Sequence, residues 1–116
     1  MLGSFVCRKV TGYVGCEPAS LTHHGLCEMR DELTALMHVM GYNPPFIDLS
    51  KKGSEDFTPE PGSIDLIATS PPYGSHERYS DEPSQSSIRF PTNEQWMNEY
   101  MRMTLENCRV DRKSVV

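Results

Sequence analysis

Hydrophobic residues recur at intervals of three or four in the segment that follows Ser20, and this spacing predicts an amphipathic helix. The apolar positions are Leu26, Met29, Leu33, Leu36, Met37 and Met40. Gly41 follows them directly, where a residue of left-handed conformation commonly ends a helix. Methionines at this spacing are expected to face a core rather than a ligand. We therefore expect a helix from residue 20 or 22 to residue 40, with its apolar stripe buried.

Three shorter segments have the pattern of β-strands. Residues 10–16 alternate and are rich in Val, Tyr and Gly, and residues 45–49 form a second run. Residues 64–69 are almost continuously apolar, which is typical of a central parallel strand that is buried on both faces. Pro71 and Pro72 must end this strand, because proline has no N–H to donate to a neighbouring strand.

A second helix is expected near the C-terminal end of the chain. Thr92 and Gln95 match the capping box that opens many helices, and the apolar residues that follow share one helical face. These residues are Trp96, Tyr100, Met103 and Cys108. Residues 74–91 are polar and without periodicity, so they are expected to form a long loop. The alternation of strands and helices predicts an α/β fold with a parallel sheet flanked by helices.

Composition limits the size of the core and the classes of partner. The chain has 116 residues, of which 37% are apolar, and a net charge of −5, which allows one domain with a thin core. No apolar run approaches the roughly 20 residues of a membrane-spanning helix, so no membrane partner is expected. The four cysteines are scattered, so neither a zinc site nor a disulfide scaffold is expected, and reduced thiols indicate the cytoplasm. The acidic balance argues against DNA binding through a broad basic surface.

Polar residues follow two of the predicted strands, Glu17 after the first and residues 70–73 after the third. Ligands of open α/β sheets bind at the carboxyl ends of the strands. An acidic residue at such a position can accept hydrogen bonds from ribose hydroxyls, which makes Glu17 a candidate nucleotide-binding residue. The alternative is an ordinary exposed glutamate in front of Pro18.

Residues 70–73 suit the binding of an amino group. Pro71 and Pro72 fix two φ angles and leave carbonyls that can face a bound amine, and Ser70 adds an oxygen at the same place. Acceptors that hold both hydrogens of a nucleobase amine favour its reactive, pyramidal form. Tyr73 offers a flat face to a base that has left its stack. The alternative is a turn that only ends a strand.

Basic residues in the segment after Tyr73 are further candidates. Arg78 and Arg89 could contact phosphate groups, and His76 lies close enough in sequence to approach a substrate. The alternative for each is a solvated side chain of the loop.

One run resembles a known catalytic motif: Asp65-Leu-Ile-Ala-Thr-Ser-Pro-Pro-Tyr73 is similar to that of S-adenosylmethionine-dependent DNA amino-methyltransferases. The spelling Ser-Pro-Pro-Tyr is more typical of enzymes that methylate cytosine N4, whereas Asp-Pro-Pro-Tyr and Asn-Pro-Pro-Tyr are commoner for adenine N6. The resemblance covers most of residues 13–109. It implies a Rossmann-like methyltransferase fold, a flipped DNA base as the partner and S-adenosylmethionine as the cofactor, with no metal.

The resemblance also implies roles for single residues. It assigns the binding of the target base and its amine to Ser70, Pro71, Pro72 and Tyr73. It assigns the binding of the cofactor's ribose to Glu17 and the binding of its adenine to Ser54 and Glu55.

The chain departs from the family pattern at both ends. Residues 1–12 lack the glycine-rich cofactor turn, and residues 1–7 look like the end of the helix that follows such a turn. Residues 111–116 resemble a translated sequencing adapter, which predicts a non-native tail. Residues 1–110 are thus expected to be the central, truncated part of a methyltransferase domain that binds its cofactor poorly or not at all.

Several alternatives stay open for this methyltransferase reading. The spelling of the motif favours cytosine N4 as the substrate. Adenine N6 and an RNA base are the alternative substrates. An inactive truncated chain without catalytic function is the other alternative. The expected location is the cytoplasm of a bacterium or of a phage host, and the oligomeric state is open.

Overall fold

The computed structural model describes residues 1–111, without the side chains of Ser75, Val110 and Asp111. It divides into two compact units, a first unit of Met1–Lys51 and a second unit that begins at Lys52. The predicted non-native tail at residues 111–116 lies outside the described residues, except for the backbone of Asp111. That residues 1–110 belong to one larger domain stays a prediction.

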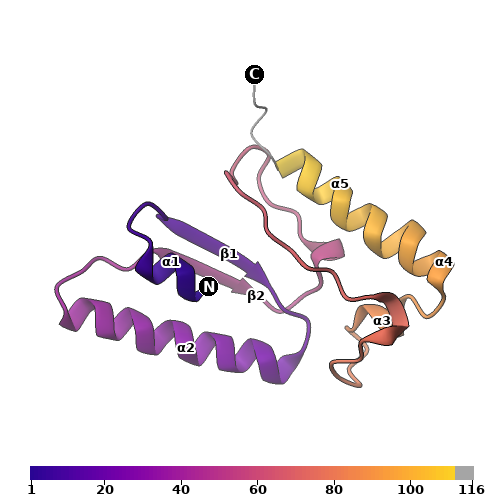
Figure 1. Ribbon diagram of the computed structural model, residues 1–116, viewed down its shortest axis with the longest axis horizontal. Coiled ribbons are helices and arrows are strands. Elements are labelled where there is room, and N and C mark those ends of the chain that lie inside the picture. The colour runs from indigo at the N-terminus through magenta and orange to yellow at the C-terminus, as the bar shows by residue number, and fades with distance from the viewer. Residues whose placement is uncertain (112–116) are drawn as a thin grey trace. The chain divides into compact units, whose positions relative to one another are not determined.

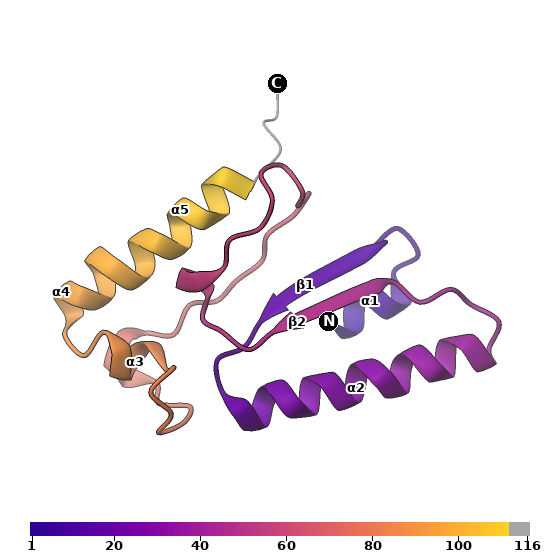
Figure 2. The same ribbon diagram turned by 180° about the vertical axis from the view of Figure 1, so that it is seen from behind.

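The first unit is a short α/β arrangement. Its elements in chain order are α1 (Leu2–Val6), β1 (Gly12–Cys16), α2 (Ser20–Val39) and β2 (Phe46–Ser50). The strands pair in parallel, with Gly12 opposite Phe46 and Cys16 opposite Ser50, and α2 runs back beside them in the opposite direction (Figure 1; Figure 2). The predicted helix at residues 1–7, the first two strands, the long helix and the α/β class are thereby confirmed.

Backbone hydrogen bonds at Gly41 and Tyr42 close the end of α2. Gly41 has a φ of 77°, its N–H donates to the His38 carbonyl, and the Tyr42 N–H donates to the Met37 carbonyl. These two bonds form a Schellman motif, in which glycine is favoured because it has no Cβ to strain the left-handed conformation. The prediction that Gly41 ends the helix is confirmed.

The apolar stripe of α2 is only partly covered. Leu26, Leu33 and Met37 are half-buried, whereas Leu36 and Met40 are more than half exposed. No residue of the helix is fully buried. The prediction of a buried stripe is therefore wrong for its outer residues, because two strands of five residues each are too small a surface to cover a helix of 20 residues.

The second unit is built around one interrupted helix. It contains η1 (Ser54–Asp56), η2 (Gly74–His76), α3 (Ser86–Arg89), α4 (Asn93–Gln95), a π-helical stretch η3 (Trp96–Met101) and α5 (Arg102–Asp111), the last three being continuous. The Gln95 N–H donates to Thr92 Oγ1 at 3.1 Å, and the Thr92 N–H donates to Gln95 Oε1 at 3.3 Å. The capping box that the sequence predicts is confirmed.

Aromatic rings form the small core of the second unit. Tyr100 and Phe90 are buried with their ring centroids 6.0 Å apart, and Trp96 lies 5.3 Å from Tyr100. The polar Thr104, one turn after Tyr100, is the most deeply buried side chain on the same helix. The helical face expected from Trp96 and Tyr100 therefore does point inward.

Two predictions for the second unit are wrong. Residues 65–69 form no strand, and Leu66 is 83% exposed, although Ile67 is half-buried. A central parallel strand needs hydrogen-bonded neighbours on both edges, and the sheet of the described residues consists of β1 and β2 alone. Residues 74–91 are also not one irregular loop, since they contain η2 and α3 and bury Gln85 and Phe90.

No helix within residues 1–111 is both long and apolar enough to cross a lipid bilayer.

Gly25 inside α2 and Gly41 just beyond its end test the description of this helix. Gly25→Ala adds a methyl group in the helix interior where no atom lies within 4 Å, so we expect the free energy of unfolding to rise by about 0.5–1 kcal/mol. Gly41→Ala forces a Cβ into the left-handed region, so the same quantity falls by about 1 kcal/mol. Urea unfolding followed by circular dichroism measures both, and a stabilising Gly41→Ala would contradict the helix end described above.

Candidate functional site

Residues 70–73 form an extended segment with two accessible side chains. Ser70 and Tyr73 are exposed, Tyr73 to 70%, whereas Pro71 and Pro72 between them are half-buried. The segment therefore presents a hydroxyl and an aromatic ring on a backbone that two prolines stiffen.

The carbonyls of this segment are partly used. The Pro72 carbonyl accepts from the Gly74 N–H at 3.0 Å, and the Tyr73 carbonyl accepts from the His76 N–H at 3.1 Å. His76 Nδ1 also lies 3.1 Å from the Tyr73 carbonyl oxygen. The Pro72 and Tyr73 carbonyls are therefore engaged by η2, and the expectation that carbonyls of this segment face an amine stays a prediction.

A carboxylate organises the residues that follow Tyr73. Glu77 Oε2 accepts from the Tyr73 N–H at 3.3 Å and from the Tyr79 hydroxyl at 2.8 Å. Arg78 pairs with Asp81 at 2.6 Å on the surface. Arg78 is thus engaged by an acidic neighbour, and a phosphate would have to compete with Asp81 for it.

Glu17 lies at the carboxyl end of β1, as the sequence predicts. Its Oε1 accepts from the Ala19 N–H at 2.8 Å, and its own N–H donates to the Ser50 carbonyl at 3.0 Å. The carboxylate therefore sits at the N-terminal end of α2, where the helix dipole favours a negative charge. Its role toward a ribose stays a prediction.

Ser54 is held by the long helix of the second unit. Its hydroxyl donates to the Tyr100 hydroxyl at 3.3 Å and lies 2.9 Å from Thr104 Oγ1. Asn107 Nδ2 donates to the carbonyls of Ser54 and Glu55, at 3.2 and 3.0 Å. These contacts fix η1 against α5. Burial raises the pKa of Tyr100 above its ordinary value, and the hydrogen bond with Ser54 reduces this effect without cancelling it.

Glu55 is a buried carboxylate with one oxygen paired. Its side chain is 1% exposed, and Oε1 accepts from Arg89 Nη1 at 2.6 Å. Arg89 also pairs with Asp56. Glu55 Oε2 is buried without a hydrogen-bond partner, and a Cβ on Gly53 would lie 2.1 Å from it, so a larger residue at that position would require the Glu55 carboxylate to move.

Burial raises the pKa of Glu55 above its ordinary value, and the nearby Arg89 guanidinium reduces this effect without cancelling it. The hydrogen bond to Asp56 raises the pKa of Arg89, so the guanidinium stays charged. Arg89, a candidate for phosphate binding, is occupied by two carboxylates in this structure. Ser54 and Glu55 face the interior of the unit, and their role toward an adenine stays a prediction.

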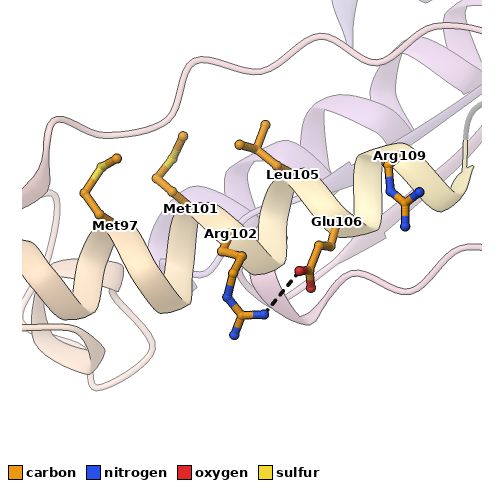
Figure 3. Close-up of a pocket in the computed structure, with 6 residues that line it drawn as sticks. All are labelled: Met97, Met101, Arg102, Leu105, Glu106 and Arg109. Atoms are coloured by element: carbon orange, nitrogen blue, oxygen red, sulfur yellow. Dashed lines mark hydrogen bonds and ion pairs between the residues drawn. The ribbon is translucent and has the colours of Figure 1, made fainter.

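A shallow hollow runs along one side of the long helix (Figure 3). It is lined by Met97, Met101, Arg102, Leu105, Glu106 and Arg109. Arg102 and Glu106 pair with each other at 3.1 Å, so the charges of the hollow partly compensate. All of these residues come from one helical stretch, and none of them was a sequence candidate.

The structure brings together some of the predicted site residues and not others. Ser70 and Tyr73 lie within one segment, whereas Ser54 and Glu55 belong to a separate, internal network. Sequence reasoning missed Glu77 and Tyr79. A signal existed, since a carboxylate and a second tyrosine follow Tyr73 at short spacing, but side-chain hydrogen bonds of this kind depend on turn geometry. Among residues 1–111, no group of three or more His, Cys, Asp and Glu side chains is arranged to hold a metal ion.

Glu55 and Arg89 give a test of the internal network. Arg89→Met leaves a buried carboxylate without its partner, so we expect the free energy of unfolding at neutral pH to fall by about 1–3 kcal/mol. Glu55→Gln removes the charge whose burial is costly and is expected to leave the protein at least as stable. Urea unfolding measures both variants, and equal losses in the two would contradict the assignment.

The pH dependence of the same pair has a defined sign. The folded state holds a raised Glu55 pKa, so it binds a proton more readily than the unfolded chain does. The native protein should therefore gain stability relative to Glu55→Gln as the pH falls from neutral through the folded-state pKa. A difference between native and variant that does not change with pH would exclude this role for Glu55.

Comparison of the chain with models of protein families, with curated proteins and with solved structures finds no match in any of the three.

Proposed function

We propose that this chain carries the target-base segment of an S-adenosylmethionine-dependent DNA amino-methyltransferase that acts on cytosine N4. The observation that carries the proposal is the segment of residues 70–73, in which an exposed serine and an exposed tyrosine flank two prolines. The parallel β1–α2–β2 arrangement is compatible with a Rossmann-like methyltransferase fold, of which it would be a part.

Ser70 and Tyr73 would have different roles in binding the base. The Ser70 hydroxyl oxygen accepts a hydrogen bond from the amine N–H and favours the form in which the nitrogen lone pair is available. The Tyr73 ring stacks on the base and holds it outside the DNA duplex. Because the Pro72 carbonyl is used by Gly74, the backbone acceptor for the amine would be the Ser70 or Pro71 carbonyl.

The fit of the cofactor residues differs from one to the next. Glu17 fits ribose hydroxyls, because its half-buried carboxylate stands at the carboxyl end of a parallel strand. Ser54 and Glu55 fit an adenine less well, since Tyr100, Thr104 and Arg89 already hold their side chains. S-adenosylmethionine, when bound, supplies the methyl group for direct transfer to the amine. The task of the chain is to bind and orient the two reactants.

A methyl-transfer assay tests the proposal. The chain is incubated with DNA and S-adenosylmethionine at roughly millimolar concentration, because residues 1–12 hold no glycine-rich turn and we expect weak cofactor binding. Mass spectrometry of the digested DNA should detect N4-methyldeoxycytidine. N6-methyldeoxyadenosine would instead favour the adenine alternative, and the absence of any methylated base would contradict the proposal.

Tyr73→Ala separates base binding from cofactor binding. Stacking of a base on an aromatic ring contributes about 1–3 kcal/mol, so we expect methyl transfer to fall by about one to two orders of magnitude. Affinity for the cofactor, measured by calorimetry, should not change. Tyr42→Ala is a matched control, because Tyr42 is an exposed tyrosine of the first unit and its loss should leave transfer unaffected. Equal effects of the two variants would show that Tyr73 has no special role.

A further inference from the structure

Tyr79 is a second exposed aromatic ring tied to the target-base segment. Its exposed fraction is 69%, nearly equal to the 70% of Tyr73. Both residues donate a hydrogen bond to the same atom, Glu77 Oε2. The Tyr79 hydroxyl donates at 2.8 Å and the Tyr73 N–H at 3.3 Å. One carboxylate oxygen thus links the hydroxyl of one tyrosine to the backbone of the other.

This link restricts the rotation of the exposed Tyr79 ring and holds the backbone that carries the exposed Tyr73 ring. The hydroxyl bond limits the rotation of the Tyr79 side chain, and the bonds to the N–H and carbonyl of Tyr73 hold its backbone on both sides of the ring. A ring that is held in place before a ligand arrives loses less freedom on binding. Two exposed rings held in this way suit a flat heteroaromatic ligand better than a flexible apolar chain.

The charges around the rings favour bases over phosphates. The Glu77 carboxylate repels phosphate groups, and the nearby Arg78 is paired with Asp81. Contacts with nucleic acid at this place should therefore depend on the bases, through stacking that tolerates any base, and only weakly on salt.

We propose that Tyr79 is a second base-stacking residue for an unpaired nucleobase, and that Glu77 is a positioning residue that ties Tyr79 to Tyr73. This inference rests on the proposed function, because the ligand it names is an unpaired stretch of the DNA substrate. It adds to the target-base segment a contact that Ser70 and Tyr73 do not make.

The test measures binding without cofactor and without chemistry. A fluorescent single-stranded oligodeoxycytidine, and the same probe with abasic sites, are titrated with the full chain and followed by fluorescence anisotropy. Tyr79→Ala should weaken binding of the oligodeoxycytidine about tenfold and leave the weak binding of the abasic probe unchanged. Tyr79→Phe, which keeps the ring, should lose less, and Tyr42→Ala should bind like the native chain.

Glu77 is tested by the difference between two substitutions. Glu77→Gln keeps an oxygen that can accept from Tyr79 or Tyr73, so it should retain more affinity than Glu77→Ala. In the Tyr79→Ala background the two Glu77 variants should bind alike, because the ring that they position is gone. A purely structural role of Glu77 would give the same loss with the abasic probe as with the intact probe.

The outcomes separate this inference from the proposed function. Native affinity of Tyr79→Ala for the oligodeoxycytidine, an equal loss on both probes, or no binding by the native chain would overturn the inference. Base-dependent binding that requires Tyr79, together with no methyl transfer at any cofactor concentration, would support the inference and overturn the methyltransferase proposal. Methyl transfer by the native chain with unchanged oligonucleotide binding by Tyr79→Ala would overturn the inference alone.

Discussion

Arg89 is the side chain on which the second unit depends. Its contacts with Glu55 and Asp56 join η1 to the end of α3, and the intervening chain, residues 57–88, contains the whole target-base segment. Closing a loop of this length costs conformational entropy, which the contacts at its ends must offset. The segment of residues 70–73 is thus carried on a loop whose two ends are fixed, while its own side chains stay accessible.

The small apolar core explains why polar contacts have this role. Among the described residues, the buried apolar side chains are Ala19, Phe90 and Tyr100. Hydrogen bonds from Asn107 and between Ser54 and the helix take over where a larger protein would use aliphatic packing. The unpaired Glu55 Oε2 is the cost of this arrangement, because a buried acceptor without a donor loses the hydrogen bonds it would make in water.

Local signals in the sequence were sufficient for much of the fold. Gly41 and the pair of Thr92 and Gln95 act on backbone groups within a few residues, so their effects could be predicted without tertiary information. The strand expected at residues 64–69 could not be, because a strand exists only with a neighbour that pairs with it. Its apolar composition suits a strand buried inside a sheet. The described residues do not form such a sheet around this segment, and Leu66 is exposed.

The same distinction between local and tertiary effects applies to the candidate site. Residues 70–73 could be located from the local sequence, because the two prolines determine the backbone there. The structure leaves Ser70 and Tyr73 exposed. The burial of Glu55 and the bridging position of Glu77 could not be predicted, because each depends on where residues distant in sequence or across a turn are placed. The relation of Glu17 to a nucleotide likewise depends on contacts beyond its own strand.

The two-stranded sheet of the first unit has a consequence for the behaviour of the protein in solution. Each of its strands has a neighbouring strand on one side only within the described residues, and β1 consists of the uncharged sequence Gly-Tyr-Val-Gly-Cys. Proteins commonly protect a free strand edge with lysine, proline or a covering loop, since such an edge can pair with another chain. β1 contains neither residue, so its open side is a natural place for copies of the protein to join at high concentration.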